Sequence, residues 1–325
     1  MAVPEITTFL LDGNGDATPL DPTAFATKVW GNEAKGFIWQ HLKRDHPDTP
    51  SLLAACGLDG FVVDALTADE TRPRCTAHGH GILLNLRGVN LNPGAEPEDM
   101  ISVRLWIEER RVIGVWARPL QATADLIGAI ERGEGPTSPG DLVAKLALRL
   151  ADRAEPSVTA LNEQIDDLEE AVWDPSANVM RTRLADLRRS AIVLRRYFVP
   201  QRDALTTLEI EDARWLSTHD RARLREASER VSRFGEELDA IRDRAQIVHD
   251  QIMDQRAEGM NQRMLVLSVV AAIFLPLGLL TGLLGINVGG VPGADNPYAF
   301  AIVCGLLVAI GLALFWWFRR AGMLK

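Results

Sequence analysis

The chain has 325 residues, of which 47% are hydrophobic and 24% are charged, and its formal net charge is -9. This length allows about two folded domains, and the acidic balance argues against a nucleic-acid partner, because proteins that bind nucleic acids usually carry a basic surface. The three cysteines, Cys56, Cys75 and Cys304, are too few and too scattered for a disulfide framework, which favours a reducing compartment.

Residues 1–154 are predicted to form an α+β domain in an α/β/α arrangement. The clearest strand signal runs from Ile101 to Ile107, where branched apolar residues recur at every second position. Val112–Trp116 follows as its hairpin partner. Further strands are predicted at Ile6–Leu11, Gly36–Trp39, Phe61–Leu66 and Ile82–Val89. Helices are predicted at Ser51–Cys56, Leu120–Arg132 and Asp141–Arg153.

One segment of this domain carries the side-chain types that bind zinc. Cys75, His78 and His80 form a Cys-x-x-His-x-His pattern. A closed structural zinc site needs four ligands, and no fourth ligand is adjacent in the sequence. Gly79 and Gly81 flank His80, so an exposed, solvated turn is the alternative.

The segment from His41 to His46 is interpreted as a surface segment after a strand rather than as a ligand set. The sequence shows no convincing nucleophile with a neighbouring base and no pair of catalytic carboxylates. An enzyme is therefore not expected, and no resident cofactor is expected.

Residues 155–263 are predicted to form a helical stalk, because apolar residues recur there at three- and four-residue spacing. The stripes of the first two helices are Leu161, Ile165, Leu168 and Val172, and Leu184, Leu187, Ala191, Leu194 and Phe198. The second helix is expected to break near Pro200, and the third to begin near Asp220. The heptad seam of the third helix consists of Val231, Phe234, Leu238, Ile241, Ala245, Val248 and Ile252.

The third helix has no proline between Asp220 and Leu275, so it is expected to continue unbroken into the membrane. It cannot bury its seam alone and needs neighbours from its own chain or from copies of the chain. Asp250 lies on this helix shortly before the membrane, between His249 and Asp254. In an assembly Asp250 would form a ring that attracts cations, and the alternative is a solvated helix face.

Residues 264–325 are predicted to form a transmembrane hairpin. Met264–Leu284 and Tyr298–Phe318 are each 21 residues long without a charged side chain, which is enough to cross a hydrocarbon core of about 30 Å. Basic residues flank the spans on the side of both termini and are absent from the loop, so both termini are expected in the cytoplasm. No cleaved signal is expected, because Met1–Thr8 lacks a basic region and a long apolar core.

The charge is divided unevenly between the hairpin and the rest of the chain. Because residues 264–325 carry one acidic and three basic side chains, the net charge of -9 leaves -11 on residues 1–263. An acidic domain beside a membrane hairpin suits the attraction of cations, and plain solubility is the alternative.

Two transmembrane helices cannot enclose a water-filled path, so the hairpin is either an anchor or part of an assembly around an axis. One face of the first span favours assembly, because its side chains become smaller toward the outer end. This face consists of Asn261, Met264, Leu267, Ala271, Leu275, Gly278 and Gly282. Its small residues permit either close helix contact or a wide pore. The bulkier second span is expected to face lipid.

The spans carry no carboxylate, histidine or basic side chain, so a permeating cation would meet only neutral oxygens. Such oxygens suit a small divalent ion, which gives up its water reluctantly.

The loop between the spans begins with Gly285, Ile286 and Asn287. A Gly-x-Asn loop between two C-terminal spans, after a stalk helix and an α/β domain, resembles the CorA-type divalent cation transporters, whose usual tripeptide is Gly-Met-Asn. The longer string Gly285–Gly293 is similar to the zinc-transporting ZntB branch of that superfamily. Two further stretches similar to that branch are Arg87–Asn92 and Glu96–Met100.

The resemblance implies a homopentamer in the bacterial inner membrane, with the first span lining the pore. Met264 and Leu267 match the apolar constriction of the family, and Asn287 would place a ring of amide oxygens at the outer mouth. Gly285 would allow the tight exit from the helix. Ile286 departs from the common Met and favours Zn2+, with Co2+, Ni2+ and Cd2+ as further substrates, over Mg2+. The resemblance leaves the driving force open, and proton-coupled zinc uptake is a candidate.

Two other functions stay open. One is a magnesium or cobalt channel of the CorA type, in which magnesium would compete with zinc. The other is a membrane-anchored signalling scaffold whose stalk transmits conformational change. The scaffold would leave the polar loop and the small-residue face of the first span unexplained.

Overall fold

The computed structural model describes residues 4–25, 36–69, 72–171, 177–286, 293 and 296–323. The chain divides into two compact units, Met1–Val248 and His249–Lys325. We call them the N-terminal unit and the hairpin unit. The division at 154 and 263 that the sequence suggests stays a prediction.

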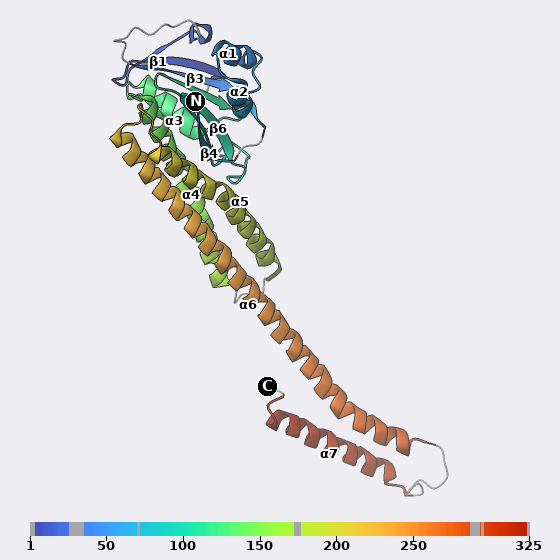
Figure 1. Ribbon diagram of the computed structural model, residues 1–325. Coiled ribbons are helices and arrows are strands. Elements are labelled where there is room, and N and C mark those ends of the chain that lie inside the picture. Colours follow the sequence, from blue (N-terminus) through green and yellow to red (C-terminus); the bar gives the residue numbers. More distant parts are fainter. Residues whose placement is uncertain are drawn as a thin grey trace. The chain divides into compact units, whose positions relative to one another are not determined.

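The N-terminal unit is built on a sheet whose strands lie in the order β2-β1-β3-β7-β6-β5-β4 (Figure 1). The strands are β1 Ile6–Leu11, β2 Ala17–Pro19, β3 Phe37–Lys43, β4 Arg74–His78, β5 Gly81–Gly88, β6 Ile101–Ile107 and β7 Arg111–Trp116. The described neighbours pair antiparallel except β3 and β7, which run parallel. The predicted hairpin is confirmed, since β6 and β7 pair from Val103 opposite Trp116 to Ile107 opposite Val112.

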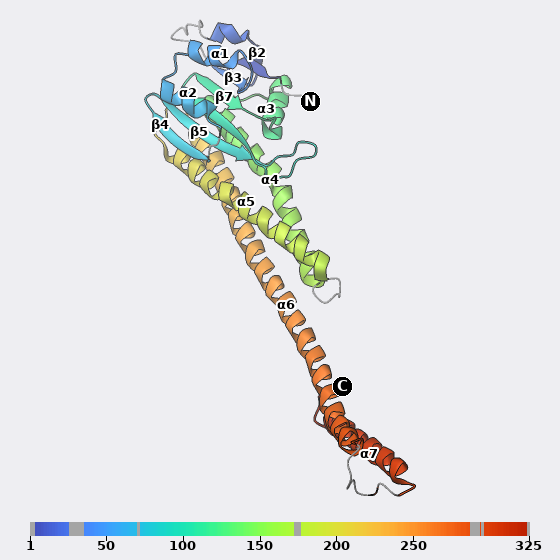
Figure 2. The same ribbon diagram turned by 90° about the vertical axis from the view of Figure 1, so that its right-hand side faces the viewer.

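Helices cover both faces of this sheet, which confirms the α/β/α prediction (Figures 1 and 2). One face packs against α1 (Thr49–Ala55) and α2 (Gly60–Thr67) through a core that includes Leu53, Leu66 and Trp106. On the other face, a Cβ added at Gly88 would meet Leu150 of helix α4 (Pro139–Glu170) at 2.7 Å. The remaining helices of this region are η1, a 3-10 helix at Pro22–Phe25, and α3 at Gln121–Glu131.

The predicted strand at Phe61–Leu66 is wrong, because this segment forms α2. Asp59 caps the helix, since its carboxylate accepts a hydrogen bond from the backbone N–H of Phe61 at 2.6 Å. The buried residues of the helix are Val62, Ala65 and Leu66. An apolar run of this length fits a strand or a helix, and the capping Asp59 is the signal that distinguishes them.

His41 lies inside strand β3 rather than in a surface segment, and only 2% of its surface is exposed. Its ring lies between those of Trp39 and Trp116, at centroid distances of 5.5 and 5.7 Å. Burial lowers the pKa of His41 to about 3, so the ring is neutral at physiological pH. The basic residues after His41 suggest a surface, but β3 is paired on both sides and continues to Lys43.

Three long helices form a bundle in the N-terminal unit: α4, α5 (Ala177–Ile210) and the first part of α6 (Thr218–Leu284) (Figures 1 and 2). The predicted seam of α6 is buried, with Val231 and Val248 each 1% exposed. The ring centroid of Phe234 on α6 lies 5.7 Å from that of Phe198 on α5. The chain therefore supplies neighbours for this part of the seam itself.

The predicted helix break near Pro200 is wrong, because α5 continues to Ile210. Likewise α4 continues past Arg153 and through Pro156 to Glu170. A proline inside a helix removes one hydrogen bond and crowds the preceding turn. Here the buried side chains on both sides of Pro200 keep the helix packed. Val172, which the sequence places in the first stripe, lies outside the described residues.

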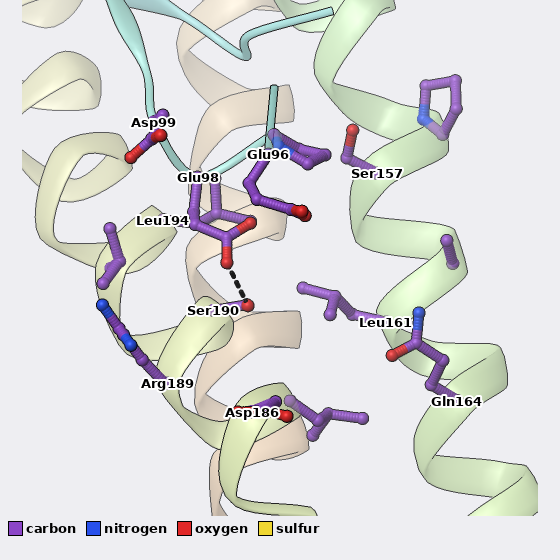
Figure 3. Close-up of a pocket in the computed structure, with 15 residues that line it drawn as sticks. Glu96, Glu98, Asp99, Ser157, Leu161, Gln164, Asp186, Arg189, Ser190 and Leu194 are labelled. Atoms are coloured by element: carbon purple, nitrogen blue, oxygen red, sulfur yellow. Dashed lines mark hydrogen bonds between the residues drawn. The ribbon is translucent and has the colours of Figure 1, made fainter. Parts of the chain in front are cut away.

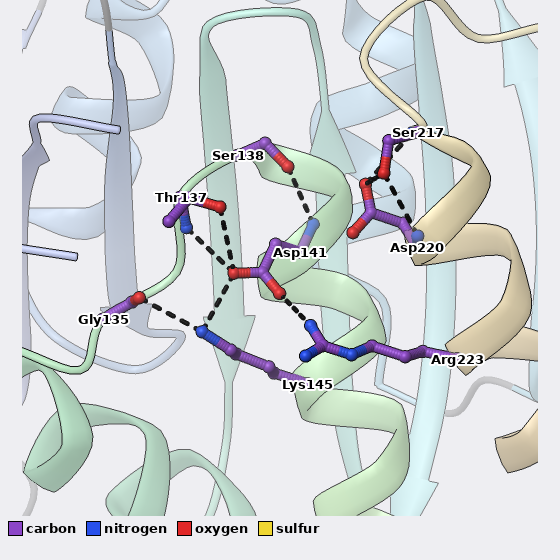
Figure 4. A network of polar contacts seen from close by, with 8 residues as sticks. All are labelled: Gly135, Thr137, Ser138, Asp141, Lys145, Ser217, Asp220 and Arg223. Atoms are coloured by element: carbon purple, nitrogen blue, oxygen red, sulfur yellow. Dashed lines mark hydrogen bonds and ion pairs between the residues drawn. The ribbon is translucent and has the colours of Figure 1, made fainter. Parts of the chain in front are cut away.

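A buried carboxylate joins the starts of α4 and α6 (Figure 4). Asp141 accepts hydrogen bonds from the backbone N–H of Thr137 at 2.9 Å and from its hydroxyl at 3.3 Å. It forms ion pairs with Lys145 at 2.9 Å and with Arg223 of α6 at 2.5 Å. Nearby, Asp220 caps α6 by accepting from the backbone N–H of Ser217 at 3.0 Å.

The environment of Asp141 favours its charged form. Burial acts to raise the pKa of this carboxyl, but the donors from Thr137, Lys145 and Arg223 outweigh it and hold the pKa below its usual value. A carboxyl whose pKa is lowered by folding stabilises the folded state above the pKa of the unfolded chain. That stability is lost as the pH falls through the folded pKa.

We predict that Asp141→Asn destabilises the N-terminal unit by about 3 kcal/mol at neutral pH, because Lys145 and Arg223 lose their shared counter-charge. The difference from wild type should begin to shrink below about pH 4, where the carboxyl of the unfolded chain becomes protonated, and should shrink further as the pH falls through the lower pKa of the folded state. Thermal unfolding of the purified full chain, followed by tryptophan fluorescence between pH 7 and pH 3, measures both effects.

The matched control is Asp203→Asn, which removes the partner of Arg202 in an exposed ion pair and should change stability by less than about 1 kcal/mol. A loss in the Asp141 variant that stays constant with pH would contradict the assigned role of its charge.

Candidate ion path along the hairpin unit

The hairpin unit consists of the second part of α6 and of α7 (Ala299–Arg320), which both have an apolar stretch long enough to cross a membrane (Figure 1). Hardly any of these stretches is buried, 6% for α6 and 0% for α7, so they are not core helices of a soluble domain. The two predicted spans are thus present as helices, and α6 continues through Pro276 to Leu284 as expected.

Helix α7 covers one face of α6. A Cβ added at Gly311 of α7 would lie 3.7 Å from a methyl group of Leu277 on α6. The less exposed residues of α6 in this region are Val269, Ile273, Pro276, Leu277 and Leu280. On α7 they are Ala299, Val303, Leu307, Ile310, Gly311, Leu314 and Phe318. Both sets recur at three and four residues, as two packed helices require.

The face of α6 that the sequence proposes for a pore lies on the opposite side. At about 100° per residue, its centre is roughly 180° away from the face that α7 covers. Its residues are all exposed in the single chain: Asn261, Met264, Leu267, Ala271, Leu275, Gly278 and Gly282. The exposed fraction reaches 75% at Leu275, and a Cβ added at Gly278 or Gly282 would meet nothing within 4 Å.

The C-terminal end of α6 offers only neutral groups. The hydroxyl of Thr281 donates to the backbone oxygens of Leu277 at 3.1 Å and Gly278 at 3.0 Å, so it is satisfied within the helix. The helix ends where the N–H of Gly285 donates to the oxygen of Thr281 at 2.9 Å. A Cβ added at Gly285 would lie only 3.0 Å from that oxygen, which gives a steric reason for glycine there.

The remaining residues of the predicted selectivity motif are placed only in part. Ile286 is 52% exposed at the end of α6. Asn287 lies outside the described residues, and its proposed role in selectivity stays a prediction.

The acidic residues before the membrane lie on the surface of α6. Asp250 and Asp254 are exposed, and His249 is half-buried. Within the described residues of one chain, no three His, Cys, Asp or Glu side chains form a group that could hold a metal ion. A cation site at Asp250 would therefore need ligands beyond the described residues of one chain, such as those of further copies.

The Cys75, His78 and His80 pattern is not brought together as a ligand set. Cys75 and His78 lie three residues apart on β4, where side chains alternate between the faces, so they point to opposite sides of the sheet. His78 contacts Asp59 at 2.6 Å, and His80 in the turn after β4 contacts Glu108 at 3.1 Å.

The Cys75 thiol is protonated at neutral pH in the absence of a metal. Burial raises the pKa of Cys75 to about 12, and the charge of Glu211 acts in the same direction. The spacing of Cys75, His78 and His80 in the sequence does not reveal that the first two lie on a strand, which turns their side chains to opposite faces.

Sequence reasoning did not find an acidic cavity in the N-terminal unit, which has a volume of about 840 Å³ (Figure 3). Glu96, Glu98 and Asp99 reach it from the loop after β5, and Asp186 reaches it from α5. Glu98 accepts a hydrogen bond from the hydroxyl of Ser190 at 2.6 Å. No local pattern in the sequence indicates this cavity, because the helix residues that complete it follow the loop by more than fifty residues.

Comparisons with known proteins give one consistent group. The model of the family described as "CorA-like Mg2+ transporter protein" matches residues 34–320. The divalent cation transporter CmaX of Pseudomonas aeruginosa is 40% identical over 286 residues, covering 87% of this chain and 86% of CmaX. The zinc transport protein ZntB of Yersinia enterocolitica is 34% identical over 314 residues, covering 96% and 94%. The solved structure of full-length CmaX aligns with a TM-score of 0.83 at 37% identity, covering 98% of each chain.

The two faces of the hairpin predict different responses to the same substitution. Gly311→Leu should destabilise the packing of α7 on α6 by about 2 kcal/mol, because the new side chain meets Leu277. Gly278→Leu should change it by less than about 1 kcal/mol, because its side chain enters open space within the chain.

Circular dichroism during unfolding in mixed detergent micelles, under conditions where the chain is monomeric, measures both variants. Equal destabilisation by Gly278→Leu and Gly311→Leu would contradict the assignment of α7 to one face only.

Proposed function

The chain belongs to the CorA-like Mg2+ transporter family and is a divalent cation transporter, and from this premise we propose that it carries zinc across the bacterial inner membrane. We further propose that five copies form one pore and that the second part of α6 lines it. In this arrangement both termini lie in the cytoplasm, residues 1–154 and 155–263 form the cytoplasmic α/β and stalk domains, and residues 264–325 form the membrane hairpin.

The observation that supports a pore is the uncovered face of α6. Two helices cannot surround water, and α7 covers only the side of α6 that carries Leu277. Copies arranged around an axis would turn the opposite side inward. That side has large apolar residues, Met264 and Leu267, at its inner end and Gly278 and Gly282 at its outer end. The pore would be narrow and gated by dewetting at the first pair, and wider at the second.

The neutral lining supports a hydrated ion as the transported species. A bare divalent ion is costly in a path without carboxylates, whereas an ion that keeps its water can bind amide and carbonyl oxygens through that water. In the assembly a ring of Asn287 amides would recognise this hydrated ion at the outer mouth. The net charge of -11 on residues 1–263 would concentrate cations at the inner end.

Zinc is proposed as the substrate for two reasons. The relative from Yersinia enterocolitica, similar over 96% of this chain, is described as a zinc transport protein. In addition, Ile286 stands where the resemblance expects methionine for magnesium transport. We propose Co2+, Ni2+ and Cd2+ as further substrates, and proton coupling as one of two possible driving forces beside the membrane potential.

A magnesium channel is the second candidate. The description of the matching family names Mg2+, and the CmaX relative is described only as a divalent cation transporter. Both candidates use the same path and differ in the ion that it selects. The scaffold alternative has no support from these relatives.

We predict that Asn287→Ala lowers the initial rate of zinc uptake by about tenfold or more, because the outer ring loses its amide oxygens. Purified protein in liposomes that contain a zinc-sensitive dye gives this rate. Asn296→Ala is the control from the same loop, where the Asn296 side chain accepts a hydrogen bond from the N–H of Tyr298 at 2.9 Å. Unchanged zinc uptake in Asn287→Ala would contradict the proposed role of Asn287 in selecting the ion.

The choice between zinc and magnesium gives a separate prediction. Millimolar magnesium should leave zinc uptake by the wild type largely intact, whereas Ile286→Met should make the uptake sensitive to magnesium. Ile286→Leu is the control, because it keeps the volume without the thioether. If magnesium abolishes zinc uptake in the wild type, the magnesium channel becomes the better description.

A further inference from the structure

A charged side chain is buried in the N-terminal unit without a carboxylate partner among the described residues. Arg104 lies on β6 and is 1% exposed. Its Nη2 donates to the backbone oxygen of Asp69 at 3.2 Å. Its Nε and Nη1 have no hydrogen-bond partner in the described part of the chain. Directly opposite on β5, the buried Asn85 amide is also unpartnered there.

This arrangement is unfavourable unless something else is bound. A guanidinium stays charged at neutral pH, and a buried charge normally has a paired counter-charge. Burial, together with repulsion from Arg44 and Arg87, lowers the pKa of Arg104 to about 10. The carboxylate that opposes this repulsion, Asp69, is 94% exposed and already forms an ion pair with Arg44 at 2.9 Å.

Arg104 lines a cavity of about 500 Å³ between the sheet and α5. Arg44, Arg87 and Arg118 also line it, so four guanidinium groups surround one space. Two of them have acceptors in the protein: Arg44 pairs with Asp45 and Asp69, and Arg87 donates to the backbone oxygen of Met100 at 2.9 Å.

Four carboxylates share this lining, but they do not neutralise Arg104. Asp45 and Asp69 pair with Arg44, and Glu98 accepts a hydrogen bond from Ser190. The fourth carboxylate in the lining is the exposed Asp99. Within the described residues neither Arg104 nor the exposed Arg118 forms an ion pair, so both have N–H groups available to an acceptor from outside the chain.

We infer that this cavity binds a small phosphate-bearing anion, held by Arg104 at its base and by Arg118 at its rim. Arginine recognises phosphate through charge-assisted hydrogen bonds, and several acceptor oxygens are needed to satisfy donors on separate side chains. The volume exceeds that of a single ion and falls in the range of sites for small metabolites. Both inorganic phosphate and a phosphate monoester carry the required group.

The site lies in the N-terminal unit and is separate from the ion path. Loss of phosphate binding would leave the proposed zinc transport unaffected, and absence of zinc transport would leave the phosphate site untouched. The two proposals can therefore fail independently.

Isothermal titration of the detergent-purified full chain tests the inference, with inorganic phosphate and adenosine monophosphate as probes at constant ionic strength. Wild type should bind one equivalent per chain. Arg104→Met should weaken binding by about tenfold or more, because it removes charge-assisted hydrogen bonds while it keeps an unbranched, flexible side chain. Arg118→Gln should weaken binding several-fold, and Arg225→Gln, an exposed arginine outside the cavity, should leave it unchanged.

Two further measurements separate a specific site from general effects. Phosphate stabilises many proteins because it is excluded from their surface, so the rise in unfolding temperature must be larger in the wild type than in Arg104→Met. Without phosphate, Arg104→Met should be at least as stable as the wild type, because it removes an unpaired buried charge. Arg104→Lys serves as a second variant that keeps the charge and should also bind more weakly.

Three outcomes would overturn the inference. The first is equal phosphate affinity in the wild type and Arg104→Met. The second is equally tight binding of chloride, which would mean that no multi-oxygen anion is selected. The third is binding that occurs only in Glu70→Gln, since Glu70 lies outside the described residues and its carboxylate would then be the natural partner of Arg104.

Discussion

A two-helix hairpin can cover only one side of each of its helices, and this constraint governs how the chain can work in a membrane. Helix α7 packs along the side of α6 that carries Leu277 and leaves the opposite side exposed over at least five turns, from Met264 to Gly282. A span without charged groups is stable in lipid with that side uncovered, so folding of one chain does not require a partner. A water-filled path for ions, in contrast, requires further copies of the chain, because two helices cannot enclose it.

The two units differ in the side chains that they carry. The described part of the hairpin unit from Met264 to Ile286 has no titratable side chain, so the ion path that we propose along it would hold an ion only weakly. The charged groups that order the protein lie in the N-terminal unit. There Asp141 holds Lys145 and Arg223 together, and Arg104 stays buried beside a cavity. Ligands and protons can therefore act on the N-terminal unit without changing the neutral lining.

Patterns that a single element expresses were predicted well. The period-two strand at β6, the heptad seam of α6 and the two apolar spans all depend on residues next to one another in the same element. The wrong predictions concern segments whose secondary structure depends on packing against distant parts of the chain. Phe61–Leu66 is apolar enough for a strand, but a capped helix packs there against the sheet. Pro200 lies within a helix because the surrounding bundle buries both sides of it.

The sequence alone determined the membrane spans, the charge division and the face that runs from Asn261 to Gly282, because each follows from the order of residues along one helix. Only the tertiary structure decided that α7 lies on the other side of α6, that Cys75 and His78 point apart, and that Arg104 is buried. These outcomes depend on which elements pack together, and contacts between distant segments leave no periodic signal in the sequence.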